Sequence, residues 1–220
     1  MTLNFDRRGP ERAERLVVFL HGYGANGADL MGLAEPLAAH MPGTAFVSVD
    51  APEACAGAPG GLQWFPIPWI DGSSEEESMA GMERAVADLD GFLDALLERE
   101  GVAAGACALL GFSQGTMMAL HVGPRRAAAL AGIVGFSGRL LAPERLADEA
   151  ATRPPILLVH GDADEVVPPA ALPQAAEALE AAGFDRLYAH VMKGTGHGIA
   201  PDGLSVALAF MRDVLGLEDG

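Results

Sequence analysis

The chain has 220 residues, which suits one compact domain, and half of them are hydrophobic, which is enough to bury a sizeable core. Its formal net charge of -16 predicts repulsion from nucleic acids and anionic membranes, and so argues against both as partners. Two cysteines, Cys55 and Cys107, are too few for a disulfide framework.

Residues 1–15 are polar and mixed in charge, and the first apolar run, residues 16–20, is too short for a signal-peptide core or a membrane span. Glycine, proline or charge interrupts every later apolar run before it reaches transmembrane length. We therefore expect a single domain over residues 1–220, located in the cytoplasm and without stable membrane insertion.

Short apolar runs alternate with longer helical segments, which predicts βα units around a mostly parallel sheet, an α/β fold. Most of the runs are continuously apolar, as expected for strands that helices cover on both faces. The strands are expected at residues 16–20, 45–49, 106–110, 132–136, 156–160 and 187–192.

Helices are expected at residues 28–40, 75–100, 115–123, 170–182 and 203–215. In the longest of these, apolar residues recur at spacings of three and four, which predicts one buried stripe that includes Met79 and Met82. The one long irregular stretch, residues 50–74, is rich in glycine and proline and holds both tryptophans. Loops of this length in a compact domain are often binding loops.

The sequence Gly-Phe-Ser-Gln-Gly at residues 111–115 stands between an expected strand and an expected helix. This G-x-S-x-G turn is the nucleophile motif of the α/β-hydrolase fold, in which small residues leave room for a strained serine. An ordinary βα turn in a glycine-rich chain is the alternative. The motif predicts Ser113 as a catalytic nucleophile.

Serine needs a base to remove its proton and an acid to orient that base, and in this fold the chain order is serine, acid, histidine. The loop after residues 156–160 offers Asp162, Asp164 and Glu165. We favour Asp164, with Asp162 as the competitor, since Asp162 would otherwise brace the loop. His197, between glycines and after the last expected strand, is the predicted base. The other histidines are expected to be structural: His21, His40, His121, His160 and His190.

The oxyanion of an acyl transfer needs backbone donors, normally the amide after the nucleophile, here Gln114, and one from the loop after an early strand. Residues 19–27 form such a glycine-rich loop. A phosphate site is disfavoured because the loop lacks a P-loop lysine and a G-x-G-x-x-G pattern. Histidines do not cluster at metal-ligand spacing, so neither metal nor cofactor is expected.

Four blocks, residues 20–24, 111–115, 160–168 and 194–199, together resemble the phospholipase/carboxylesterase family, which includes the acyl-protein thioesterases. The similarity runs over nearly the whole chain. It implies an α/β-hydrolase without a cap domain that acts on carboxylic esters. By resemblance, the nucleophile is Ser113, the base is His197 and the acid is Asp164, because the family's acid comes just before x-Val-Val-Pro. The oxyanion donors are the amides of Tyr23 and Gln114.

Spacing also argues against a lid domain, since only 19 residues (137 to 155) separate the strand at 132–136 from Ile156. Without a lid, the substrate site is expected to be open to solvent. Its expected apolar lining, with core packing as the alternative role, consists of five residues: Trp64, Phe65, Ile67, Trp69 and Val166. The chain departs from thioesterase-like members at Tyr23-Gly24-Ala25, where they commonly have leucine followed by Gly-Asp. A ring at residue 23 is expected to narrow or polarise the pocket.

These features predict a serine carboxylesterase for short- to medium-chain carboxylic esters, with thioesters and lysophospholipids as further substrate classes. The same triad would also serve an acyl-protein thioesterase, a lactonase, a peptidase or an acyltransferase. Outside enzymes, the alternative is a non-catalytic binding protein with a hydrolase fold. The partner is expected to be a small-molecule ester, and a homodimer is implied by the resemblance.

Overall fold

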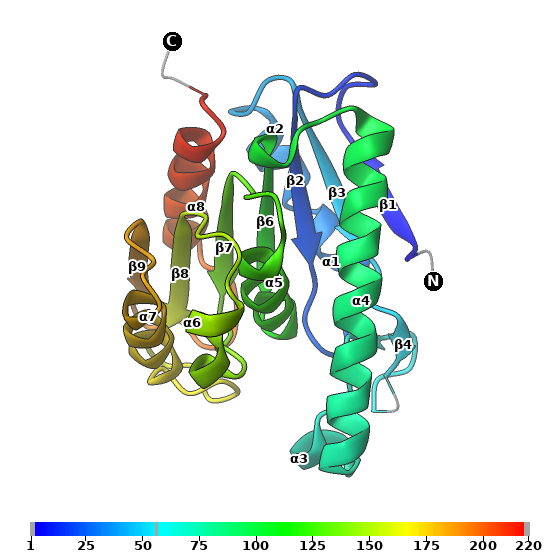
Figure 1. The fold of residues 1–220 in the computed structure, drawn as a ribbon, viewed down its shortest axis with the longest axis vertical. Coiled ribbons are helices and arrows are strands. Elements are labelled where there is room, and N and C mark those ends of the chain that lie inside the picture. The colour runs from blue at the N-terminus through cyan, green and yellow to red at the C-terminus, as the bar shows by residue number, and fades with distance from the viewer. Residues whose placement is uncertain (1–2, 56, 218–220) are drawn as a thin grey trace.

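The computed structural model describes residues 3–55 and 57–217 and contains a seven-stranded sheet in the order β1-β3-β2-β6-β7-β8-β9. β1 is antiparallel to β3, and every other neighbouring pair is parallel (Figure 1). The strands are β1 (Phe5–Arg8), β2 (Arg15–Leu20), β3 (Thr44–Val49), β6 (Cys107–Phe112), β7 (Gly132–Phe136), β8 (Ile156–Gly161) and β9 (Leu187–Met192). A separate antiparallel pair joins β4 (Glu53–Ala54) and β5 (Leu62–Gln63). The expected mostly parallel sheet is confirmed.

Helices cover both faces of this sheet (Figure 1). They are α1 (Gly27–Met31), α2 (Ala34–Ala38), α3 (Pro68–Asp71), α4 (Glu75–Glu100), α5 (Gln114–Arg125), α6 (Leu146–Glu149), α7 (Ala171–Ala181) and α8 (Pro201–Val214), with short 3₁₀ turns at Ala104–Ala106 and Pro143–Arg145. Alternate residues of β2 point to opposite faces, so Leu16 joins a core with α4, α5 and α7, while Val17 joins one with α1, α2 and α8. None of the described helices is long and apolar enough to cross a membrane.

The single helix expected at residues 28–40 is wrong, because the structure has two short helices there, α1 and α2. Pro36 has no N–H, so the helical hydrogen bond to the carbonyl of Gly32 is missing at the junction. The amide of Leu33 bonds instead to the carbonyl of Leu30 at 2.9 Å, which tightens the turn and ends α1. The remaining expected helices and strands lie within a few residues of the observed bounds.

Met79 was expected in the core, and this is wrong, because its side chain is 64% exposed. The buried stripe of α4 passes through Ala85 and Leu89 and ends near Leu96, and partly buried Met82 packs against that core. Met79 lies about 60° around the helix from Met82, given 3.6 residues per turn. In the first turn, the side chain of Ser78 instead donates to the carbonyl of Pro66 at 2.7 Å.

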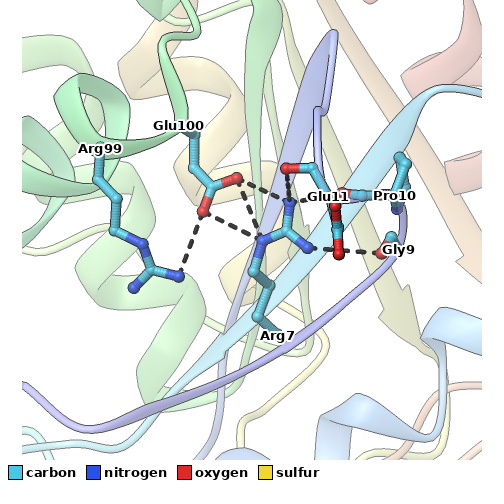
Figure 2. A network of polar contacts seen from close by, with 6 residues as sticks. All are labelled: Arg7, Gly9, Pro10, Glu11, Arg99 and Glu100. Carbon is cyan, nitrogen blue, oxygen red and sulfur yellow. Dashed lines mark hydrogen bonds and ion pairs between the residues drawn. The ribbon is translucent and has the colours of Figure 1, made fainter.

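The edge strand β1 was not predicted from sequence, and an ion pair attaches it to the end of α4. The Arg7 guanidinium donates to both carboxylate oxygens of Glu100, at 2.8–3.1 Å, and to the carbonyl of Pro10 at 2.7 Å (Figure 2). Phe5 packs edge-on against Phe92 of α4, with ring centroids 5.4 Å apart. These contacts join residues that are far apart in the chain. The four residues of β1 therefore carry little local sequence pattern from which a strand could be predicted.

Candidate active site

Ser113 lies at the sharp turn between β6 and α5, with φ 54° and ψ -114°. Glycines on either side make this turn sterically possible. A Cβ on Gly115 would lie 1.9 Å from the carbonyl oxygen of Leu20, and one on Gly111 would lie 2.5 Å from the carbonyl oxygen of Gly115. The turn therefore needs glycine at both positions, and it holds the serine at the carboxyl end of the central strands.

Three predicted catalytic side chains meet at this point. The Nε2 atom of His197 is 3.0 Å from the Oγ of Ser113, and its Nδ1 atom is 2.8 Å from the Oδ2 of Asp164. The His197 ring also packs on Phe112, with centroids 4.9 Å apart. These contacts join residues 84 and 33 positions apart in the chain.

The carboxylate of Asp164 is buried and fully hydrogen-bonded. Its Oδ1 atom accepts from the amides of Val166 and Val167, each at 2.9 Å, while its Oδ2 atom faces His197. Burial alone would raise the pKa of Asp164, but the hydrogen bonds from His197, Val167 and Val166 together lower it. Asp164 is therefore a fixed anion beside the imidazole at neutral pH.

Asp162, the competing acid, has other partners. Its Oδ1 atom accepts from the amide of Gly194 at 2.6 Å, and its Oδ2 atom is 3.5 Å from the ammonium of Lys193. The carboxylate of Asp162 thus braces the loop that carries His197, which matches its alternative role.

The loop after β2 passes directly against the nucleophile, since a Cβ on Gly22 would lie 3.1 Å from the Cβ of Ser113. Buried His21 fixes this loop: its Nε2 atom accepts from the amide of Ala51 at 3.0 Å, which assigns the ring proton to Nδ1, 2.8 Å from the carbonyl oxygen of Gly22. Burial lowers the pKa of His21, which keeps the ring neutral. In a trans peptide the N–H of Tyr23 then points away from His21.

The side chain of Gln114 clamps the tryptophan loop to the nucleophile turn. Its Oε1 atom accepts from the amide of Trp64 at 2.9 Å, and its Nε2 atom donates to the carbonyl of Phe65 at 2.8 Å. The indole N–H of Trp64 donates to the carbonyl of His21 at 3.0 Å. One loop is thus tied to both segments that carry the predicted oxyanion amides.

The five predicted lining residues fall into two groups. Trp64, Phe65 and Ile67 are buried members of the core on the α4 side of the sheet. Trp69 on α3 is 67% exposed and Val166 in the acid loop is 60% exposed. Only the last two present broad side-chain surface to solvent.

Tyr23 turns its hydroxyl toward α3, where it donates to the Oδ2 of Asp71 at 3.3 Å. The same oxygen accepts from the amide of Ile67 at 2.8 Å. Burial, with the neighbouring Cys55 and Asp71, raises the pKa of the Tyr23 phenol, which stays neutral. The ring thus fastens the loop after β2 to α3.

Sequence reasoning missed three supporting contacts. His160, expected to be structural, places its Nε2 atom 2.9 Å from the carbonyl of Val167 and 3.3 Å from the Oδ2 of Asp164. The clamp of Gln114 and the hydrogen bonds of His21 are the other two. For the contacts of His160 and His21, the only local signal was a histidine that precedes a glycine at the end of a strand.

Comparisons with known proteins found similar sequences and structures. A sequence model of the family described as Phospholipase/Carboxylesterase matches residues 7–215. The chain is 30% identical to Esterase YpfH of Escherichia coli (strain K12), over 95% of this chain and 87% of that protein. It is 27% identical to Acyl-protein thioesterase 1 of Gibberella zeae, over 90% of each. The crystal structure of esterase PE8 superposes with a TM-score of 0.91 at 41% identity, covering 98% of this chain and 100% of that one.

Proposed function

Because the chain belongs to the phospholipase/carboxylesterase family, and is thus a carboxylic ester hydrolase, we propose that it hydrolyses short- to medium-chain carboxylic esters through Ser113, His197 and Asp164. The family resemblance expected from the four sequence blocks is confirmed. The observation that carries the proposal is the chain of contacts from Ser113 Oγ to His197 Nε2, 3.0 Å, and from His197 Nδ1 to Asp164, 2.8 Å.

In the first step His197 takes the proton of Ser113 as its Oγ atom attacks the ester carbonyl. Asp164 holds the Nδ1–H tautomer and stabilises the imidazolium that forms. The imidazolium then gives its proton to the leaving alcohol, which leaves an acyl group on Ser113. Water, deprotonated by His197, attacks this acyl-enzyme and releases the carboxylic acid.

The former carbonyl oxygen of the tetrahedral intermediate carries a negative charge. We assign the stabilisation of this oxyanion to the backbone amides of Tyr23 and Gln114, which donate hydrogen bonds to it. The position of Gln114 at the N-terminus of α5 supports this role, because the helix dipole favours negative charge there. The hydrogen bond from His21 to the carbonyl of Gly22 supports the other donor, because it turns the Tyr23 N–H away from the buried side.

Replacement of the nucleophile tests the proposal. In Ser113→Ala the acyl-enzyme cannot form, so kcat/KM for p-nitrophenyl butyrate should fall by about 10³-fold or more. A fluorophosphonate probe should label the native protein and not the variant, which also separates an enzyme from a binding protein. Near-native turnover by folded Ser113→Ala would overturn the assignment.

The two aspartates offer a matched pair for the acid. Asp164→Asn removes the charge that stabilises the imidazolium and should lower kcat by about 10³-fold. Asp162→Asn also removes one negative charge from this loop, but it leaves the contact between His197 and Asp164 in place. Its kcat should therefore stay within a few-fold of the native value. Equal losses in the two variants would contradict Asp164 as the acid.

Acyl-protein thioesterase activity is the second candidate, favoured by the relative of that name from Gibberella zeae. Thioesters follow the same two steps with a thiol as the leaving group. The family resemblance implies leucine at this position in thioesterase-like members, whereas this chain has the Tyr23 ring, held against Asp71, so we expect ester turnover to exceed thioester turnover. A chain-length series of p-nitrophenyl esters beside acyl-CoA substrates would measure this preference.

A further inference from the structure

Two segments far apart in the chain border Ser113. The loop after β7 contacts the backbone of Ser113: the amide of Ser113 donates to the carbonyl of Phe136 at 2.8 Å, and a Cβ on Gly138 would lie 2.9 Å from the carbonyl oxygen of Ser113. The segment that leads into α3 is held against the nucleophile turn by the side chain of Gln114. The next residues of each segment are therefore at the rim of the site.

At this rim the guanidinium of Arg139, which follows Gly138, lies over the indole ring of Trp69, 5.0 Å from its centroid. Both side chains are exposed. Among the described residues, Arg139 has no hydrogen-bond or carboxylate partner, whereas Arg84, Arg126 and Arg186 all pair with acids. A face-stacked guanidinium keeps its N–H edge free to bind an anion, and its position is held by the cation–π contact.

A cavity of about 460 Å³ adjoins Arg139. Residues 139–143 form one wall, and Val167, Pro168 and the start of α7 form the other. The lining side chains are apolar apart from those of Gln174 and Arg139, and Arg139 is the one charged residue among them. Since Val167 lines the cavity and its amide donates to Asp164, the cavity borders the loop that carries the proposed acid.

We propose that Arg139 is a specificity-determining residue that binds a carboxylate on the ester substrate, whose apolar part occupies this cavity. The preferred substrates are then monoesters that carry a second, ionised acid group. A bidentate guanidinium–carboxylate contact gives both charge and orientation. The attraction between Arg139 and the carboxylate acts only at short range, because a chain of net charge -16 repels anionic esters at long range. The inference rests on the proposed esterase activity of Ser113.

Matched ester pairs test it. The first pair places the charge on the acyl side: p-nitrophenyl hydrogen adipate against its neutral methyl ester, with p-nitrophenol release as the readout. The second pair places it on the alcohol side: para-acetoxybenzoate against its neutral methyl ester. The measured quantity is the ratio of kcat/KM for the anionic ester to kcat/KM for the neutral one.

In Arg139→Gln this ratio should fall about tenfold for the pair that places its carboxylate at Arg139, and the loss should appear mainly in KM. Arg139→Lys keeps the charge but not the fork and should retain part of the ratio. Arg186→Gln changes the net charge equally at a distant ion pair with Asp213 and should leave the ratio unchanged. The pair that responds identifies the acyl or the alcohol side.

An Arg139→Gln ratio equal to the native one in both pairs would overturn the role of Arg139. Equal falls in Arg139→Gln and Arg186→Gln would also overturn it, because the effect would then be long-range charge. Absence of turnover of the neutral esters by the native protein is a different failure, since it would count against the proposed function itself.

Discussion

Ser113 has a positive φ of 54°, a backbone conformation that side chains with a Cβ rarely adopt. The surrounding contacts impose it: the amide of Ser113 bonds to Phe136, and the amides of Thr116 and Met117 bond to the carbonyl of Ser113. Strain of this kind persists only where the neighbouring structure determines it. The result is a hydroxyl that projects from the turn toward His197.

The proposed nucleophile and base could be predicted from sequence because their signals are local. A serine between two glycines at a strand-helix junction, and a histidine between glycines after the last strand, each fit within seven residues of chain. The choice of Asp164 over Asp162 needed the family resemblance. The stack of Arg139 on Trp69 joins residues 70 positions apart (139 - 69), so no local pattern reports it.

His121 provides a pH-dependent prediction. Burial, with Arg125 nearby, lowers the pKa of His121 to about 4, and the Nδ1 atom of its ring has no partner among the described residues. The unfolded imidazole titrates near 6.5, so between these values the unfolded state binds a proton that the folded state does not. The free energy of unfolding should therefore decrease as pH falls from about 6.5 to about 4.

In His121→Leu this contribution is removed. Urea unfolding at a series of pH values should show that the native protein loses about 3 kcal/mol more than His121→Leu between pH 7 and pH 4. His40→Asn changes an exposed histidine and should follow the native pH dependence. Parallel curves for His121→Leu and the native protein would contradict the assignment.

At the scale of elements, the longest sequence signal predicted its helix well. The helix expected at residues 75–100 is α4, although Met79 lies outside its buried stripe. The division of residues 28–40 into α1 and α2 depends on one missing N–H at Pro36, which the apolar period does not register. β1 depends on pairing with β3 and on the Arg7–Glu100 contact, both distant in sequence.

Two helical glycines give opposite expectations. Gly91 lies on the exposed face of α4, where an added Cβ meets nothing within 4 Å, so Gly91→Ala should raise the free energy of unfolding by about 0.5–1 kcal/mol through helix propensity. In Gly115→Ala the Cβ would meet the backbone of β2 at 1.9 Å, so α5 must move off the sheet. Its stability should fall by about 3 kcal/mol or more.

Chemical denaturation of the two variants measures both changes. Far-UV circular dichroism of native Gly91→Ala should match that of the unsubstituted protein, which serves as the check on folding. A Gly115→Ala variant as stable as the native protein would show that the close packing of α5 on β2 is not required.

At the scale of the molecule, the alternation of apolar runs with helical segments predicted a sheet between two layers of helices. It did not predict the oligomeric state. Alternate residues of the central strands face opposite cores, as the continuously apolar runs indicated. β9 is the exception: it is an edge strand on which Tyr188 and Val191, which point to opposite faces of the sheet, are both exposed. The cytoplasmic location, the absence of a nucleic-acid partner and the homodimer stay predictions.

We propose that residues 1–220 unfold as one domain. The two cores share the central strands, so that neighbouring residues of β6 such as Leu109 and Leu110 belong to opposite cores, and loss of one helical layer would expose strands that the other layer needs. Differential scanning calorimetry should give one transition, with a van't Hoff enthalpy equal to the calorimetric enthalpy of about 150 kcal/mol near 60 °C. Two separated transitions, or a van't Hoff enthalpy near half the calorimetric value, would instead mean that the two faces of the sheet fold independently.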